Sequence, residues 1–237
     1  MQTRFARAFD FIRSSEWKTS GRPELAGGPW PGYHGEVDKH PSCIILAGKA
    51  GSGKTSSLRA LVEAATAAGH RVAAVLQPDK GRAPDGLGRG FSMELLAGKE
   101  LVLSRESMDL AREKRSEDLP SAGLILHGHF AFDAAAFSKA LTFIRAALAG
   151  GAGPELIGLD EIGKLELGRG EGLRSCLDAA LEAGPRADGP GLLVLTARAL
   201  NVPDILRITQ ASGLDSAVFQ AEDRAAFLGA GLAALLK

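Results

Sequence analysis

Residues 43–55 read CIILAGKAGSGKT, an apolar run followed by a glycine-rich turn that ends in a lysine and a threonine. The apolar run over residues 43–47 lies between Pro41 and Gly48, which is typical of a buried β-strand. The turn matches the pattern G-x-x-x-x-G-K-[ST], in which backbone N–H groups surround phosphate oxygens. Apolar side chains then recur at helical spacing until Gly69. The stretch therefore predicts a strand, a phosphate-binding loop and a helix in succession.

The residues of this turn have distinct expected roles. Its glycines allow the backbone to wrap with N–H groups pointing inward. Lys54 would reach the β- and γ-phosphates of a nucleotide, and the hydroxyl of Thr55 would hold Mg²⁺. Glycine is frequent, at 30 of 237 residues, yet the residue frequencies give only on the order of a few per cent for a chance match. The residues expected to bind nucleotide are Gly48, Lys49, Ala50, Gly51, Ser52, Gly53, Lys54, Thr55 and Ser56.

A second apolar run ends in two acids. Residues 156–161 read LIGLDE, a strand pattern that would deliver Asp160 to the edge of a sheet beside the phosphate-binding loop. There Asp160 can hold Mg²⁺ together with Thr55, usually through water, and Glu161 can polarise an attacking water molecule. Taken alone, the same sequence pattern would also fit an ordinary strand followed by a polar turn. Together with the loop, the run predicts a metal-assisted site that acts on a triphosphate.

Strand and helix patterns alternate along the rest of the chain. This alternation predicts an α/β three-layer sandwich of the P-loop type, with a mostly parallel central sheet covered by helices. Runs at residues 91–96 and 99–103, separated by Ala97-Gly98, predict an inserted β-hairpin. The charged stretch 104–120 is expected to be a solvated helix or loop. Strands are further predicted at residues 72–76, 123–126, 156–160, 192–196 and 217–219, and helices at 171–183, at 223–236 and after a cap at Asp133.

Composition divides the chain into three regions. Residues 1–19 form an N-terminal extension with helical spacing, residues 20–42 form a linker rich in proline and glycine, and residues 43–237 form the P-loop domain. The arginine-rich start could be an organelle-targeting helix, but its acids favour a helix that docks on the domain or on a partner. Trp17 and Trp30 either pack against the domain or anchor a protein partner through residues in this extension and linker.

Charge and hydropathy exclude several classes of protein. Hydrophobic residues make up 45% of the chain, and 28 basic residues balance 28 acidic ones, so the chain is neither disordered nor generally attracted to nucleic acid or anionic lipid. No apolar run approaches the roughly 18–20 residues of a membrane span. Cys43 and Cys176 fit no metal-ligand spacing and are expected to be buried, reduced thiols. We therefore expect a cytoplasmic protein without a nucleic-acid or membrane partner.

Residues 160–167, DEIGKLEL, resemble the DEIGKMEL signature of the THEP1-type nucleoside-triphosphatases, called cancer-related nucleoside-triphosphatase in animals. The one change in the signature is Leu165 for methionine. The resemblance extends over about residues 43–228 and leaves out the extension and linker. Further stretches that resemble the family in order are residues 88–91 with 103–105, residues 127–133 and residues 222–224.

The resemblance implies a compact P-loop domain that slowly hydrolyses ATP, GTP and other nucleoside triphosphates with Mg²⁺ and low base selectivity. One departure concerns residues 77–82, which read QPDKGR where the family has TxEVRE. A second departure is that His129 and Phe130 replace the Lys and Tyr of the family's GKYG.

Other polar residues have a functional and a structural interpretation. Lys164 is a candidate for stabilising charge at the γ-phosphate, and Arg224 for an arginine finger or for stacking on the base, although each could be a surface residue. Thr196 could sense the γ-phosphate or simply end a buried strand. His127 and His129 could chelate a metal, but no third ligand is visible nearby. With Lys54 and Glu161, Lys164 and Arg224 complete the predicted catalytic set.

Three functions remain open. The first is Mg²⁺-dependent hydrolysis of a nucleoside triphosphate. The second is a kinase for a nucleotide or small metabolite, with the arginines of residues 104–118 in a lid. The third is a nucleotide-dependent switch that acts on a protein through residues 1–40. The sequence has no guanine-reading N-K-x-D motif, so it does not fix the base.

Overall fold

The computed structural model describes residues 41–81, 90–121, 123–184 and 191–235. They belong to a unit that spans Pro41–Lys237. The extension predicted over residues 1–19, almost all of the predicted linker, and both tryptophans lie outside the described residues.

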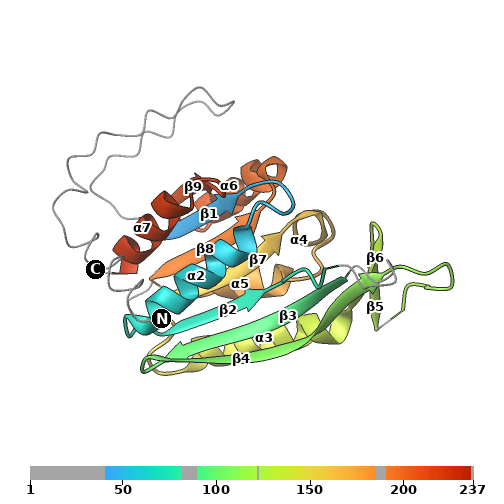
Figure 1. Cartoon of the computed structure of the whole chain (residues 1–237), viewed down its shortest axis with the longest axis horizontal. Helices are drawn as coiled ribbons and strands as arrows, with labels where there is room; N and C mark the ends of the chain where they lie inside the picture. The colour runs from blue at the N-terminus through green and yellow to red at the C-terminus, as the bar shows by residue number, and fades with distance from the viewer. Residues whose placement is uncertain (1–40, 82–89, 122, 185–190, 236–237) are drawn as a thin grey trace. The chain divides into compact units, whose positions relative to one another are not determined.

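One twisted sheet forms the centre of this unit (Figure 1). Its strands follow the order β5-β6-β4-β3-β2-β7-β8-β1-β9. The strand β1, which leads into the phosphate-binding loop, therefore lies near one edge of the sheet, separated from β7 by β8 alone. The strands are β1 (Cys43–Ala47), β2 (Val72–Leu76), β3 (Gly90–Lys99), β4 (Val102–Glu113), β5 (Leu124–His127), β6 (Phe130–Asp133), β7 (Leu156–Ile162), β8 (Leu192–Ala197) and β9 (Ser216–Gln220).

The sheet is mixed, so the prediction of a mostly parallel sheet was wrong. The pairings from β2 through β7, β8 and β1 to β9 are parallel, whereas those from β2 through β3, β4 and β6 to β5 are antiparallel. The parallel half is the half that alternates with helices, as parallel connections require. β3, the next strand along the chain after β2, pairs with it antiparallel, and this reversal creates the second half.

The predicted inserted hairpin was misplaced. β3 and β4 turn at Glu100-Leu101, whose φ angles are 53° and 67°, and both strands extend the central sheet instead of standing apart from it. Gly98 lies inside β3. Only glycine fits at this position, because a Cβ there would come within 2.1 Å of Thr66 Oγ1 and 2.5 Å of Val72 Cγ2. This glycine serves close packing and not a turn.

β4 also replaces most of the solvated helix or loop predicted over residues 104–120. It pairs with β3 along its length but with β6 only over Ala111–Glu113. Residues 102–110 therefore border the sheet on one side only, and charged side chains are common on such exposed strand edges. The charges that suggested a loop are those of an edge strand.

Helices cover both faces of the sheet (Figure 1). On one face, Leu58 and Phe227 from α2 and α7 are buried against Ile44 and Leu46 of β1. On the other face α3, α5 and α6 bury a second cluster against the sheet. The helices are α2 (Lys54–Ala67), α3 (Ala134–Ala149), α4 (Lys164–Arg169), α5 (Arg174–Ala183), α6 (Val202–Ala211) and α7 (Arg224–Leu235).

The sequence analysis missed β6, α4 and α6. The first turn of α6 contains Pro203, a position where proline is tolerated. The predicted cap at Asp133 is confirmed, because its carboxylate accepts the N–H of Ala135 at 2.8 Å. Within the described ranges, no helix is both long and apolar enough to cross a bilayer.

Candidate active site

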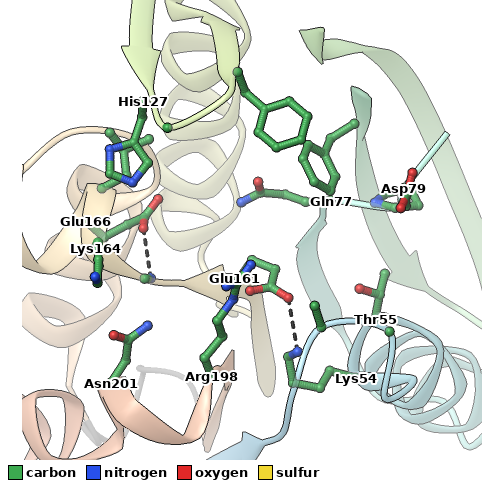
Figure 2. A pocket seen from close by; sticks show the side chains of 18 of the residues that line it. Lys54, Thr55, Gln77, Asp79, His127, Glu161, Lys164, Glu166, Arg198 and Asn201 are labelled. Carbon is green, nitrogen blue, oxygen red and sulfur yellow. Dashed lines mark hydrogen bonds and ion pairs between the residues drawn. The ribbon is translucent and has the colours of Figure 1, made fainter. Parts of the chain in front are cut away.

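A cleft of about 760 Å³ lies at the carboxyl edge of the parallel strands (Figure 2). Ligands bind at this edge in open α/β sheets. Segments far apart in the sequence line the cleft: the phosphate-binding loop with the start of α2, the residues after β2, the start of β3, the turn and strand of β5–β6, the β7–α4 connection and the β8–α6 connection.

The phosphate-binding loop requires its glycines for different reasons. Gly51 and Gly53 have φ angles of 74° and 88°, in the left-handed region that favours glycine. Gly48 is needed for space, because a Cβ there would lie 2.4 Å from Ser52 Oγ and 2.9 Å from Ala221 Cβ. The predicted helix begins at Lys54, directly after the loop.

Lys54 is almost fully buried, at 3% exposure. Its ammonium group donates hydrogen bonds to the carbonyl oxygens of Gly48, at 3.3 Å, and Lys49, at 3.0 Å. The same group lies 3.1 Å from Glu161 Oε1 (Figure 2). The predicted phosphate-binding cation and the predicted base are thus adjacent.

Asp160 is completely buried, at the centre of a hydrogen-bond network. Its Oδ2 accepts the Thr55 hydroxyl at 2.7 Å and the Gln77 N–H at 3.0 Å, and its Oδ1 accepts the Thr196 hydroxyl at 2.5 Å. Burial raises the pKa of Asp160, while the hydrogen bonds from Thr196, Gln77 and Thr55 oppose that rise. The network fixes this carboxylate beside the first turn of α2.

Thr196 has a second bond in this network. β8 lies between β1 and β7 and hydrogen-bonds to both, so its end reaches the acids on β7. The Thr196 oxygen accepts the N–H of Glu161 at 2.8 Å while its hydroxyl donates to Asp160. One buried side chain therefore holds both the Asp160 carboxylate and the backbone N–H of Glu161.

The oxygen donors of Thr55 and Asp160 suit Mg²⁺, because hydroxyl, carboxylate and water oxygens are the ligands this ion prefers. By contrast, the described part of the chain contains no group of three or more His, Cys, Asp and Glu side chains that could hold a metal. His127 and His129, both near the β5–β6 turn, therefore gain no further ligand of these types among the described residues.

Glu161 has an unusual backbone conformation. Its φ angle is 59°, and the pairing of β7 with β8 shifts register between Leu159 and Ile162. Such irregularities re-aim a side chain and occur next to active sites. They direct the Glu161 carboxylate toward Lys54 at the edge of the sheet.

The two remaining polar residues of the DEIGKLEL segment have different environments. Lys164 begins α4, lines the cleft and is exposed. Glu166 is buried and accepts the N–H groups of Gly163, at 2.9 Å, and Leu173, at 3.2 Å. Burial raises the pKa of Glu166, against these hydrogen bonds. Glu166 thus holds the connection that follows Glu161.

The structure brings together most, but not all, of the predicted catalytic set. Lys54, Glu161 and Lys164 line the cleft, whereas Arg224 begins α7, is exposed and does not line it. Arg198, which the sequence analysis missed, lines the cleft and points toward Glu161 (Figure 2). Its only signal in the sequence is its place two residues after Thr196, at the carboxyl end of a predicted strand.

Comparison with known proteins agrees with this site. A model of the NTPase family matches residues 43–224. The chain belongs to the NTPase family. Membership makes this NTPase a nucleoside-triphosphate hydrolase. Two solved structures agree with the resemblance to THEP1-type proteins. None of the curated proteins matches its sequence.

Two solved structures share its fold. THEP1 from the hyperthermophile Aquifex aeolicus is 18% identical with a TM-score of 0.52, and the match covers 82% of this NTPase and 99% of that chain. A human cancer-related nucleoside triphosphatase is also 18% identical with a TM-score of 0.52, over 80% of this NTPase and 94% of that chain. At this identity the two likenesses establish the fold alone.

Proposed function

We propose that this NTPase cleaves the β–γ bond of ATP, GTP and other nucleoside triphosphates in a Mg²⁺-dependent reaction with little selectivity for the base. The observation that carries the proposal is the adjacency of Lys54 and Glu161, 3.1 Å apart beside the buried Asp160. A phosphate-binding cation and a candidate base then meet within one cleft, and the carboxylate proposed to hold Mg²⁺ lies buried next to Thr55, which lines that cleft.

The phosphate-binding loop and Lys54 would hold the β- and γ-phosphates. Thr55 and Asp160 would hold Mg²⁺, which would supply positive charge to neutralise the charge that develops on the phosphate oxygens. The two side chains are already adjacent, because the Thr55 hydroxyl donates a hydrogen bond to Asp160 Oδ2 at 2.7 Å. The buried network around Asp160 keeps that carboxylate in place without a search through rotamers, as preorganised electrostatic catalysis requires.

Glu161 would orient a water molecule and accept its proton as the water oxygen attacks the γ-phosphorus. The bond from that phosphorus to the β–γ bridging oxygen breaks, leaving the diphosphate and inorganic phosphate. Lys164 and Arg198 line the same cleft, and neither forms an ion pair with another described residue. Both cations are free to stabilise charge that develops on the γ-phosphate oxygens. A role for Arg224 stays a prediction.

Low base selectivity is proposed because the resemblance to the THEP1-type nucleoside-triphosphatases implies it. The lack of an N-K-x-D motif excludes only one way of reading guanine. A cytoplasmic location and a partner bound through residues 1–40 stay predictions.

Both cysteines, Cys43 and Cys176, are free and buried, and burial raises the pKa of each thiol to about 12. They are inert at neutral pH, as expected for reduced structural cysteines.

Phosphate release from ATP, GTP, CTP and UTP tests the proposal. With Mg²⁺ all four should be hydrolysed at rates within about tenfold of one another, as expected without base readout, and a chelator should abolish release. Lys54→Ala should lose both nucleotide binding and turnover, while Lys99→Ala, an exposed lysine outside the cleft, should lose neither. Absence of phosphate release from folded, magnesium-supplied protein would contradict the proposed function.

A further inference from the structure

We propose that the cleft contains a second binding site, for a small molecule with a flat heteroaromatic ring and a hydroxyl group, and that this molecule can receive the γ-phosphoryl group in place of water. The site is the part of the cleft lined by Phe91, Phe130 and Phe132, called here the aromatic wall. The proposal rests on the proposed function, because it uses the same triphosphate site and the same Glu161.

The aromatic wall lies beyond the acids, as viewed from the phosphate-binding loop. From β1 the sheet continues through β8, β7, β2, β3 and β4 to β6. Phe91 is the second residue of β3 and Phe130 is the first residue of β6. The antiparallel pairing brings the starts of these two strands to the edge of the sheet where β2 and β7 end. The cleft therefore presents the loop, then Glu161, then the aromatic wall.

This order decides which ligand group meets the wall. A triphosphate on the loop with its γ-phosphate at Glu161 has its base at the opposite end of the phosphate chain. The wall thus faces the γ-phosphate and not the base of that nucleotide. In-line transfer requires the attacking oxygen on this side of the phosphorus, opposite the leaving diphosphate.

The wall has the chemistry of a ring-binding surface. The Phe91 and Phe130 centroids are 5.0 Å apart at 61°, and those of Phe130 and Phe132 are 6.2 Å apart at 65°. All three rings are half-buried: they pack against the core cluster and also line the cleft. Because the three rings are only half-buried, part of each stays accessible from the cleft, and flat heterocycles stack on aromatic rings.

Polar side chains line the same cleft as the aromatic wall. Gln77, Asp79 and His127 line the same cleft, from the end of β2 and the end of β5 (Figure 2). The Gln77 side-chain amide donates to the Asp160 carbonyl at 2.9 Å, which fixes its orientation. An apolar pocket with a few convergent polar groups is the usual form of a small-molecule site, where the polar groups orient ring heteroatoms and hydroxyls.

The transfer balances in atoms and charge. The acceptor's hydroxyl oxygen forms a bond to the γ-phosphorus, and its proton passes to the Glu161 carboxylate. The bond from that phosphorus to the bridging oxygen breaks, and its electron pair stays on the nucleoside diphosphate. The products are the diphosphate, the phosphorylated acceptor and the proton released from Glu161 to solvent.

Five nucleosides serve as probes, because each has a flat heteroaromatic base and a primary hydroxyl: adenosine, guanosine, cytidine, uridine and thymidine. Full-length protein is incubated with Mg²⁺, γ-³²P-ATP and each nucleoside, and label is measured in phosphate and in nucleoside monophosphate. Saturation-transfer NMR measures binding. At least one nucleoside should bind and become labelled.

Phe130→Leu keeps an apolar side chain but removes the ring. It should lower the ratio of labelled nucleoside to labelled phosphate by about tenfold, the effect of losing one stacking partner. Phe219→Leu is the matched control, because Phe219 lies on β9, is half-buried against Phe227 and does not line the cleft. This control should leave the ratio unchanged.

Three results would overturn the proposal: no nucleoside binds, a nucleoside binds but label appears only in phosphate, or the two phenylalanine variants change the ratio equally. The proposed hydrolysis fails separately, when ATP alone releases no phosphate. Label transfer to a nucleoside without phosphate release would support the acceptor site and reject hydrolysis as the main reaction.

Discussion

The ammonium group of Lys54 lies 3.1 Å from a carboxylate oxygen of Glu161. The remaining polar contacts of Lys54 are to the carbonyl oxygens of Gly48 and Lys49, within the loop itself. Phosphate oxygens that enter the loop carry the same charge as Glu161 and compete with it for this ammonium group. Nucleotide binding and release of the Glu161 carboxylate should therefore be coupled, so that the base becomes available when the γ-phosphate arrives.

Glu161→Gln separates binding from turnover. The amide cannot accept a proton from water, so kcat should fall by about 10²–10⁴-fold, the usual contribution of a general base. The variant also removes the negative charge that competes for Lys54, so nucleotide should bind more tightly. Phosphate release gives the first quantity and titration with a fluorescent nucleotide analogue gives the second.

Glu222→Gln is a suitable control, since Glu222 is an exposed acid outside the cleft. Its kcat and nucleotide affinity should match those of the parent chain. Hydrolysis by Glu161→Gln at the parent rate would show that another group activates the water.

Thr196→Val tests the bond that joins the two acids. Valine has nearly the same shape, but it leaves the Glu161 N–H without its partner and removes a donor to Asp160. Because Thr196 is completely buried, the free energy of unfolding should fall by about 1–3 kcal/mol. Urea denaturation measures this loss. Thr196→Ser keeps the hydroxyl and should retain most of the stability and activity, whereas equal losses for both variants would contradict the hydrogen-bond argument.

The features that could be predicted from sequence are those whose physical cause lies in residues close together in the chain. The phosphate-binding loop is one, because φ angles of 74° and 88° at Gly51 and Gly53 demand glycine at fixed spacing from Lys54. Asp160 is another, because an apolar run before an acid reads as a strand that ends at the ligand edge. Both roles stay predictions, but in the structure Thr55, the residue after Lys54, donates its hydroxyl to Asp160 at 2.7 Å.

The features that could not be predicted depend on distant partners. Gly98 is a residue type typical of turns, yet glycine is required there because the strand packs closely against Thr66 and Val72. The charges of β4 suggested solvent, and only the sheet order shows that they lie along an exposed strand edge. Arg198 has no motif around it, and its place in the cleft follows from the end of β8 meeting the end of β7.

Glu166 should make stability depend on pH. Burial, opposed by the N–H groups of Gly163 and Leu173, raises the pKa of Glu166 above its ordinary value of 4.5. The folded protein then binds this proton more tightly than the unfolded chain does. Its contribution to stability is complete below pH 4.5 and is lost as the pH rises through the folded pKa. Over that window the free energy of unfolding should therefore decrease.

Glu166→Gln does not ionise and should lack this part of the slope. It also has a single side-chain acceptor for two N–H groups, so a roughly pH-independent loss of about 1–3 kcal/mol is expected besides. Urea denaturation of both proteins at a series of pH values from below 4.5 upward distinguishes the two effects. Identical pH slopes would show that Glu166 does not titrate differently in the folded and unfolded states.

Arg198 and Arg224 compete for the role of the charge-stabilising arginine, and their positions favour Arg198. Arg198 lines the cleft and points toward Glu161, whereas Arg224 begins α7 outside the lining (Figure 2). Arg198→Ala should lower kcat by about 10²-fold, the usual effect of removing one donor to developing charge, with a smaller change in KM because the interaction strengthens in the transition state. Arg224→Ala should leave kcat unchanged. Arg198→Lys should retain only part of the parent kcat, because an ammonium lacks the planar fork of a guanidinium.

Both arginines are exposed, so thermal unfolding should be similar in all three variants, and a loss of kcat cannot then be attributed to misfolding. A normal kcat for Arg198→Ala together with a low one for Arg224→Ala would reverse the assignment and place the γ-phosphate nearer the start of α7.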